Sequence, residues 1–123
     1  MEKQKTLAAN AQLSGIALHT GARVTLKMTP APVDTGIVFR RIDLPGSPEV
    51  RALASSVAKT DHGTTIAAGH AVAFTVEHIM AALHVHGIDN CVVEMNGMEP
   101  PIADGSALSY FNAIAEAGIV EQD

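Results

Sequence analysis

Aromatic residues are almost absent from this sequence: its 123 residues include three Phe, one Tyr and no Trp. The core must therefore be built from Ala, Val, Ile, Leu and Met, and a hydrophobic content of 47% is enough for one globular domain. Proteins that bind single-stranded nucleic acid stack bases on aromatic side chains, which are too few here. Together with a net charge of -5, this scarcity argues against a nucleic-acid partner.

The chain also lacks a second cysteine and any long apolar run. Cys91 has no partner for an internal disulfide, and within NCVVEM we expect a small buried strand residue rather than a catalytic thiol. No segment reaches the roughly 18 apolar residues of a membrane-spanning helix, and MEKQKTLAAN lacks the apolar core of a secretory signal. These absences predict a cytoplasmic protein with no integral membrane segment.

Lys and Arg are missing from the second half of the chain. All eight lie in residues 1–60 with four acidic residues, a formal charge of +4, whereas residues 61–123 carry nine acidic residues. We expect two complementary faces of one domain rather than a dedicated anion-binding surface.

Strand patterns dominate the first two thirds. In RVTLKMTP, apolar and polar residues alternate, which predicts a strand that buries Val24, Leu26 and Met28. The segments IVFRRIDL and EVRALASSV, separated by the turn PGSP, predict a hairpin-like pair. TTIAAGHAVAFT predicts two short strands around Ala68-Gly69.

From Thr75 the apolar period becomes that of a helix. Thr75 is the expected N-cap, Ile79, Leu83 and His86 share one stripe, and Gly87 is the expected residue just after the helix. The segment therefore predicts a helix of about three turns, close to the mean length in globular proteins.

The last third contains a strand, a loop and a second helix. CVVEMN predicts the strand, and ALSYFNAIAEAG predicts a helix capped by Ser106 and ended by Gly118. Between them, Asp104 belongs to a turn, and Glu99 begins a stiff segment with two prolines that is expected to hold that turn. Strands crowded early and helices late predict an α+β domain, with both helices on one face of a mostly antiparallel sheet.

Glu77 and His78 form the first candidate functional pair. A carboxylate in the first helical turn is stabilised by the helix dipole by about 0.3–1 kcal/mol, which explains Glu77 without catalysis. The chemical alternative is metal-assisted hydrolysis, in which an imidazole binds Zn²⁺ and a neighbouring carboxylate takes a proton from bound water. Spacing alone does not decide, because Ala82 rather than a second histidine lies four residues after His78.

The other histidines have local explanations too. His84 and His86 fall in the last helical turn, where imidazoles can bond free carbonyls, and His19 ends a strand at a turn. His62 follows Asp61 in a loop, where turn chemistry is one account and metal ligation the other.

Six motifs follow one another in a fixed order. They are G-x-x-L-H-T-G at 15–21, P-A-P-x-x-T-G at 30–36, F-R-R at 39–41, T-V-E-H at 75–78, G-I-D-N at 87–90 and D-G-S-A at 104–107. In order and spacing, from about Lys3 to Glu121, they resemble the N-terminal domain of the LpxC family. That family comprises the zinc-dependent UDP-3-O-acyl-N-acetylglucosamine deacetylases of lipid A biosynthesis in Gram-negative bacteria.

The resemblance implies both a fold and a site. Each of the family's two domains is a two-layer α/β sandwich, a sheet layer under a helix layer, and the active site lies between them. The T-V-E-H match implies that Glu77 is the general base and His78 a zinc ligand in removing the N-acetyl group from the acyl-sugar nucleotide. His19 and Asp104 lie in other matching motifs and are further candidate site residues.

The resemblance also predicts an incomplete site. Residues 1–123 correspond to a single domain, the family's first, whereas the other zinc ligands, a histidine thought to act as acid and the acyl channel come from the second. One histidine cannot hold catalytic zinc, which usually needs three protein ligands. We therefore expect this chain to be inactive alone and to lose zinc without a partner domain.

Three hypotheses remain open. The chain is half of a deacetylase that a second domain completes, or a free-standing module for binding or regulation that pairs with itself or with an authentic deacetylase. Asp61-His62-Gly63 favours the module, because the family usually has small or apolar residues there, whereas the presence of Glu77, His78, His19 and Asp104 favours the half-enzyme. Polar His84-Val85-His86, where the family commonly has small or apolar residues, together with Asp61-His62-Gly63, argues against a fit of the family's substrate. In the third hypothesis, Asp61 and His62 supply the missing ligands beside His78.

Overall fold

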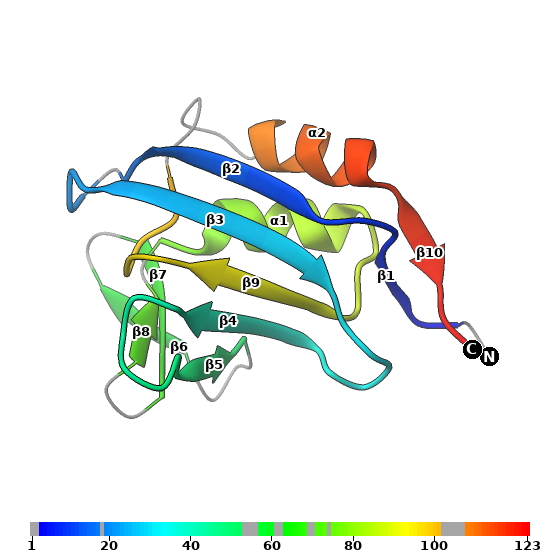
Figure 1. The fold of residues 1–123 in the computed structure, drawn as a ribbon, viewed down its shortest axis with the longest axis horizontal. Coiled ribbons are helices and arrows are strands. Elements are labelled where there is room, and N and C mark those ends of the chain that lie inside the picture. Colours follow the sequence, from blue (N-terminus) through cyan, green and yellow to red (C-terminus); the bar gives the residue numbers. More distant parts are fainter. Residues whose placement is uncertain are drawn as a thin grey trace.

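The computed structural model describes residues 3–17, 19–52, 57–60, 63–68, 71–73, 75–101 and 108–123, which form ten strands and two helices. The strands are β1 (Lys5–Leu7), β2 (Ala11–Ile16), β3 (Arg23–Pro30), β4 (Ile37–Arg41), β5 (Glu49–Arg51), β6 (Val57–Thr60), β7 (Gly63–Ala68), β8 (Ala71–Ala73), β9 (Cys91–Met95) and β10 (Ile119–Glu121). The helices are α1 (Glu77–Val85) and α2 (Leu108–Ala117), and both lie on the same side of the main sheet (Figure 1). The α+β prediction is confirmed.

The main sheet has five strands in the order β2-β3-β9-β4-β5. Its neighbours are antiparallel except β4 and β9, which run parallel with Ile37 opposite Cys91. A parallel pair needs a long crossover, and here the chain from β5 to α1 provides it. The predicted hairpin-like pair is β4 and β5, in which Phe39 lies opposite Val50.

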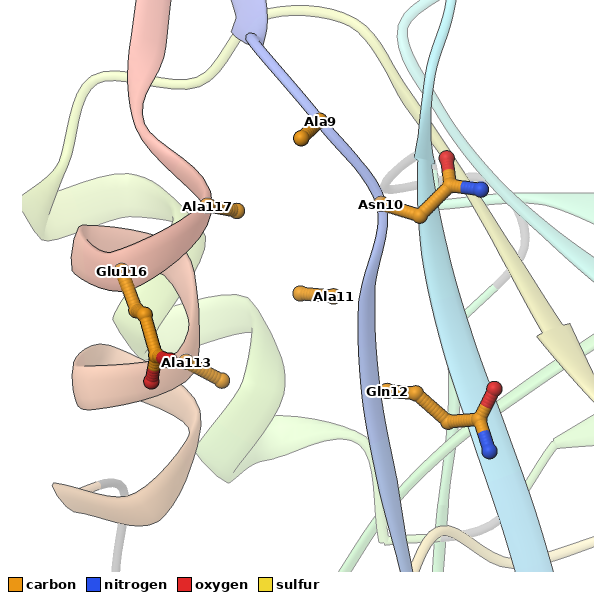
Figure 2. Close-up of a pocket in the computed structure, with 7 residues that line it drawn as sticks. All are labelled: Ala9, Asn10, Ala11, Gln12, Ala113, Glu116 and Ala117. Atoms are coloured by element: carbon orange, nitrogen blue, oxygen red, sulfur yellow. The ribbon is translucent and has the colours of Figure 1, made fainter.

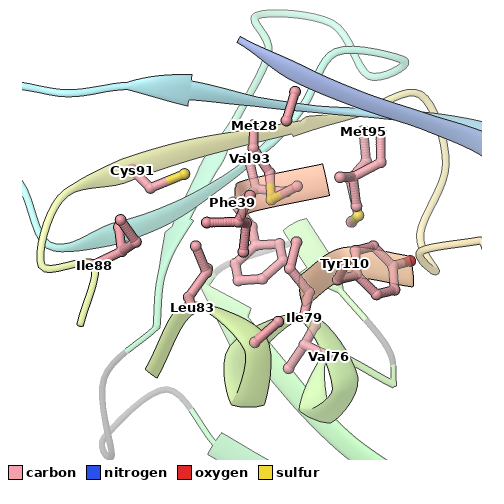
Figure 3. Packing of buried hydrophobic residues seen from close by; sticks show 14 of the residues in the cluster. Met28, Phe39, Val76, Ile79, Leu83, Ile88, Cys91, Val93, Met95 and Tyr110 are labelled. Carbon is pink, nitrogen blue, oxygen red and sulfur yellow. The ribbon is translucent and has the colours of Figure 1, made fainter. Parts of the chain in front are cut away.

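The core lies between this sheet and the two helices. Val24, Leu26 and Met28 face it from β3, as the alternation predicts, and each is at most 1% exposed. Figure 3 shows side chains from β9 and from both helices meeting over Phe39, which is fully buried. Cys91 is also fully buried in β9, which confirms its predicted structural place.

The opposite face of the main sheet is polar. Glu94 of β9 lies between Lys27 and Arg40, with N–O distances of 3.7 and 3.2 Å, and Arg40 also pairs with Glu49 at 2.7 Å. Such half-exposed ion pairs contribute little to stability, so they mainly keep this face hydrated.

A smaller three-stranded sheet, β6-β7-β8, packs against β5. Strands β7 and β8 are the two short strands predicted around Ala68-Gly69. Arg41 links the two sheets, because its buried guanidinium donates to the Val72 carbonyl at 2.8 Å and to both carboxylate oxygens of Asp43.

The two ends of the chain pair with each other, which the sequence patterns did not predict. Strand β1 runs antiparallel to β10, with Lys5 opposite Glu121, at the right-hand end of Figure 1. Asn90, 1% exposed, supports the pair: its side-chain amide donates to the Oε1 atoms of Gln4 and Gln122, at 2.8 Å each. Its side-chain oxygen Oδ1 accepts the Gly36 N–H at 2.9 Å.

The end of α1 confirms one prediction and corrects another. Gly87 follows the helix with φ +72°, and the N–H groups of Gly87 and Ile88 donate to the carbonyls of His84 and Leu83, a Schellman motif. His86, expected to bond carbonyls at the end of its own helix, instead contacts the Phe111 carbonyl of α2 at 3.0 Å and stacks on the Phe111 ring. Beside α2 the imidazole makes both a polar contact and a ring-stacking contact with Phe111, whereas the carbonyls at the end of α1 would offer only a hydrogen bond.

Candidate functional site

Helix α1 begins differently from the prediction. Its first residue is Glu77, the N-cap position is held by Val76, and no side chain caps the helix there. Thr75, the predicted N-cap, is one residue too early and has a left-handed backbone with φ +54°. Its hydroxyl donates to Glu99 Oε2 at 2.7 Å instead, so the N-cap prediction for Thr75 is wrong.

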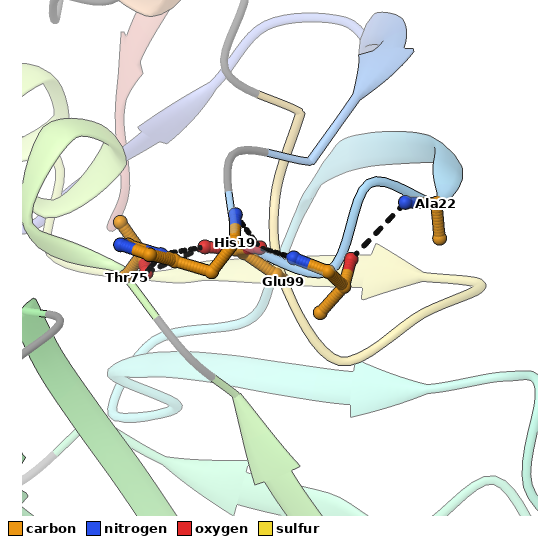
Figure 4. Close-up of polar contacts among 5 residues, drawn as sticks. His19, Ala22, Thr75 and Glu99 are labelled. Atoms are coloured by element: carbon orange, nitrogen blue, oxygen red, sulfur yellow. Dashed lines mark hydrogen bonds and ion pairs between the residues drawn. The ribbon is translucent and has the colours of Figure 1, made fainter.

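Glu99 is the centre of a polar cluster that joins three segments of the chain (Figure 4). Its side chain is fully buried. Oε1 accepts the backbone N–H groups of His19 and Thr20 at 2.9 and 3.0 Å, and Oε2 lies 2.6 Å from His19 Nδ1 besides accepting from Thr75. The carboxylate therefore connects the turn after β2 to Thr75, which lies two residues before α1.

These contacts favour the charged form of Glu99. Burial by itself would raise the pKa of the carboxyl, but the hydrogen bonds from Thr75, His19 and Thr20 outweigh it and hold the pKa below its ordinary value of 4.5. A buried carboxylate that accepts this many donors is ionised at neutral pH.

Glu77 and His78, the predicted pair, occupy the first turn of α1 and are both half-buried. His19, a further candidate, is brought to the same place, since its Nδ1 lies 3.2 Å from the Thr75 hydroxyl. The other candidates, Asp61, His62 and Asp104, lie outside the described residues, as does the expected cap Ser106. Their roles stay predictions.

The donor set of the described residues fits part of a zinc site. His78 offers an imidazole and Glu77 a carboxylate from adjacent positions in the first turn of α1. Within the described ranges, however, no three His, Cys, Asp or Glu side chains gather closely enough to hold a metal ion. Three protein ligands are the rule for catalytic zinc, so further ligands would have to come from elsewhere.

Glu99 and Thr75 are the site residues that sequence reasoning missed. Glu99 was expected only to begin a stiff loop, yet it is 1% exposed and one of the few buried charged residues among those described. A weak signal was present: Glu99 stands between Met98 and two prolines, and a glutamate buried with such neighbours must be paired.

A cavity of about 300 Å³ opens elsewhere, between β2 and α2 (Figure 2). Its walls are mostly alanine, from Ala9 and Ala11 on one side and Ala113 and Ala117 on the other, with Glu116 at the rim. These residues come from the segment that leads into β2, the start of β2 and the second half of α2, and none of the lining residues belongs to α1. Among the described residues, neither helix is long and apolar enough to cross a bilayer.

Comparison with known proteins agrees with the motif order. Residues 4–123 match the family model described as LpxC, UDP-3-O-acyl N-acetylglycosamine deacetylase. The chain is 50% identical over 116 residues to the UDP-3-O-acyl-N-acetylglucosamine deacetylase of Geobacter sp. strain M21, covering 94% of this chain and 38% of the relative. It is 46% identical over 120 residues to the bifunctional enzyme LpxC/FabZ of Chlorobaculum tepidum, covering 98% of this chain and 26% of the relative.

A third relative extends the match to the whole chain. The UDP-3-O-acyl-N-acetylglucosamine deacetylase of Marinobacter nauticus is 45% identical over 123 residues, which are 100% of this chain and 40% of that protein. The chain thus spans well under half the length of these relatives. With the six motifs, the two-layer fold and a family match from residue 4 to residue 123, the chain belongs to the LpxC family of deacetylases.

Proposed function

We propose that this chain supplies Glu77 and His78 to the active site of a zinc-dependent deacetylase acting on UDP-3-O-acyl-N-acetylglucosamine in lipid A biosynthesis. The observation that carries the proposal is the adjacent carboxylate and imidazole in the first turn of α1, in a chain of this family. The remaining zinc ligands would come from a second deacetylase domain, as the greater length of the relatives suggests.

Glu77 and His78 have separable tasks in this proposal. An imidazole nitrogen of His78 would serve as one zinc ligand, and zinc bound there would supply a Lewis acid that activates water near neutral pH. Glu77, in the first turn of α1, takes the proton from the attacking water as general base. The C–N bond of the N-acetyl group then breaks, the proton taken by Glu77 passes to the departing nitrogen, and acetate and the free amine are released.

The test is reconstitution. The chain is joined to the C-terminal part of the Geobacter relative, and acetate release from the acyl-sugar nucleotide is measured. Glu77→Gln should lower kcat by about 10²–10⁴-fold, the usual contribution of a general base. Glu116→Gln, on the exposed side of α2, is the matched control and should leave the rate unchanged. No acetate release from a correctly folded fusion would contradict the proposal.

Zinc analysis of the 123-residue chain separates this proposal from a self-contained metal site. Because the described residues form no three-ligand group, we expect the isolated chain to purify without stoichiometric zinc. Stoichiometric zinc that is lost on His62→Ala as well as on His78→Ala would favour the site built from Asp61, His62 and His78. Solution mass, measured on the same sample, tests whether the chain pairs with itself.

A further inference from the structure

The start of α1 is held by a residue that lies beyond the helix and beyond the next strand. We propose that Glu99 is a positioning residue for Glu77 and His78: its buried carboxylate keeps Thr75 in the left-handed conformation, and Thr75 fixes the first turn of α1. Glu99 is only 1% exposed, so it acts through Thr75 and not by touching a substrate. The consequence for catalysis rests on the function proposed above, whereas the positioning itself does not.

The backbone of Thr75 needs outside support. A β-branched residue at φ +54° is an outlier that persists only where the surroundings impose it, and such outliers gather at functional sites. The contacts that impose it here are the 2.7 Å hydrogen bond to Glu99 Oε2 and the 3.2 Å contact with His19 Nδ1.

Glu99 is itself well anchored. Its other oxygen accepts two backbone N–H groups in the turn after β2, so rotation of the carboxylate would cost both bonds. The chain that follows is also fixed, because Pro101 forms a β-bridge with Ala17 and its carbonyl accepts the Tyr110 hydroxyl. Thr75 is therefore bonded to a rigid support.

Val76 and Ile79 anchor the start of α1 by burial in the core, but the N-cap position itself has no side-chain hydrogen bond. Glu77 and His78 sit in the turn that frays first. The bond from the Met80 N–H to the Val76 carbonyl, 3.0 Å long, belongs to this turn. Its opening reports directly on whether the turn that carries Glu77 and His78 is held.

Hydrogen exchange of the 123-residue chain, followed by NMR, measures this opening. We expect Glu99→Ala to speed exchange of the Met80 amide by more than about tenfold relative to the Ile88 amide, a difference of about 1.4 kcal/mol. Ile88 is the reference because its amide donates to Leu83 at the opposite end of α1. Thr75→Val, which removes the hydroxyl and keeps the shape, should give the same pattern, and Thr75→Ser should not.

The matched control is Asn90→Ala. Asn90 is as buried as Glu99 and also joins distant segments by several hydrogen bonds, but it makes no contact with Thr75. Its loss should speed exchange at Ile88 at least as much as at Met80. Equal acceleration at both amides in Glu99→Ala, or none at Met80, would overturn the proposal and leave Glu99 with a general structural role.

Activity of the reconstituted enzyme provides the second readout. Glu99→Ala and Thr75→Val should lower kcat by about tenfold or more with a smaller change in KM. Thr75→Ser, which keeps the hydroxyl, should have nearly the kcat of the enzyme without substitutions. If the reconstituted enzyme without substitutions shows no deacetylation, the proposed function is wrong. The exchange experiment on the 123-residue chain still decides whether Glu99 has the positioning role. If Glu99→Ala alters KM alone, the positioning role is wrong although the deacetylase is right.

Discussion

Glu99 and Cys91 are both buried, but their neighbours shift their pKa values in opposite directions. Glu99 receives hydrogen bonds on both oxygens, and its pKa falls although burial opposes this. Cys91 is equally buried among the apolar side chains of β9 and the helices, and burial raises the pKa of its thiol to about 12. A carboxylate with donors stays charged in the interior, whereas a thiol without strong donors stays neutral.

Glu99 should make stability depend on pH in the acid range. Because its pKa is lower in the folded than in the unfolded chain, the carboxylate stabilises the fold above about pH 4.5 and loses this effect as pH falls through the folded pKa. We expect Glu99→Gln to reduce the free energy of unfolding at pH 7 by about 1–3 kcal/mol, and by less at pH 3. Urea unfolding at the two pH values measures this, with Glu116→Gln as the exposed control. An equal loss at both values would contradict the linkage.

Cys91 should be inert in the folded protein. A thiol that is fully buried and has a pKa of about 12 exposes almost no thiolate at pH 8. Labelling with a thiol reagent at pH 8 should therefore be at least about a hundredfold slower than in denaturant, where the pKa returns to about 8.5. Rapid labelling of folded protein would show that β9 opens locally.

At the scale of elements, the bend after β9 depends on close contact with β3. A Cβ atom on Gly97 would lie 2.9 Å from Val24 Cγ2, inside the core side of the sheet. This bend leads directly to Glu99. The path of the backbone through the bend therefore determines where the Glu99 carboxylate lies relative to Thr75 and His19.

We expect Gly97→Ala to destabilise the protein by about 1–3 kcal/mol, the usual cost of overpacking a core. Gly15→Ala in β2 is the control, because the added Cβ would meet only Pro101 at an ordinary 3.4 Å. Thermal unfolding of both variants gives the comparison. A loss for Gly15→Ala as large as that for Gly97→Ala would refute the steric explanation.

Periodicity predicted those elements whose one face is buried. The alternation in β3 and the stripe through Ile79 and Leu83 in α1 correctly predict which residues of these elements are buried in the core. Thr75 failed as a cap because its hydroxyl has a distant partner in Glu99, and no local pattern reveals a contact across 24 residues. Strand β10 has three exposed residues and exists by pairing with β1, so it has no alternation to detect.

At the scale of the whole molecule, one buried side chain joins both ends of the described chain to the turn between β3 and β4. Asn90 uses its amide nitrogen toward Gln4 and Gln122 and its amide oxygen toward the Gly36 N–H. Gln122 also donates to the Ala31 carbonyl. The network closes the end of the domain that lies away from the first turn of α1.

Asn90→Asp should therefore be costly although it is nearly isosteric. The substitution replaces two donated hydrogen bonds by a carboxylate facing the acceptor oxygens of Gln4 and Gln122. We expect a loss of about 1–3 kcal/mol at pH 7, measured by urea unfolding. Asn112→Asp on the exposed side of α2 is the control and should change stability by less than about 0.5 kcal/mol. Equal effects would show that the network is not what stabilises this end.

The antiparallel pairing of β1 with β10 also determines how the molecule would respond to mechanical tension. The two ends of the chain leave the pair on the same side, because β1 begins at Lys5 opposite Glu121, where β10 ends, and Leu7 lies opposite Ile119. Inter-strand hydrogen bonds lie perpendicular to antiparallel strands, so a pull between the two ends acts along these bonds and breaks them one pair at a time. Single-molecule stretching should show this peeling as an early step at low force, before the five-stranded sheet and the Glu99 cluster give way. One abrupt rupture at high force would show instead that the ends and the sheet resist tension together.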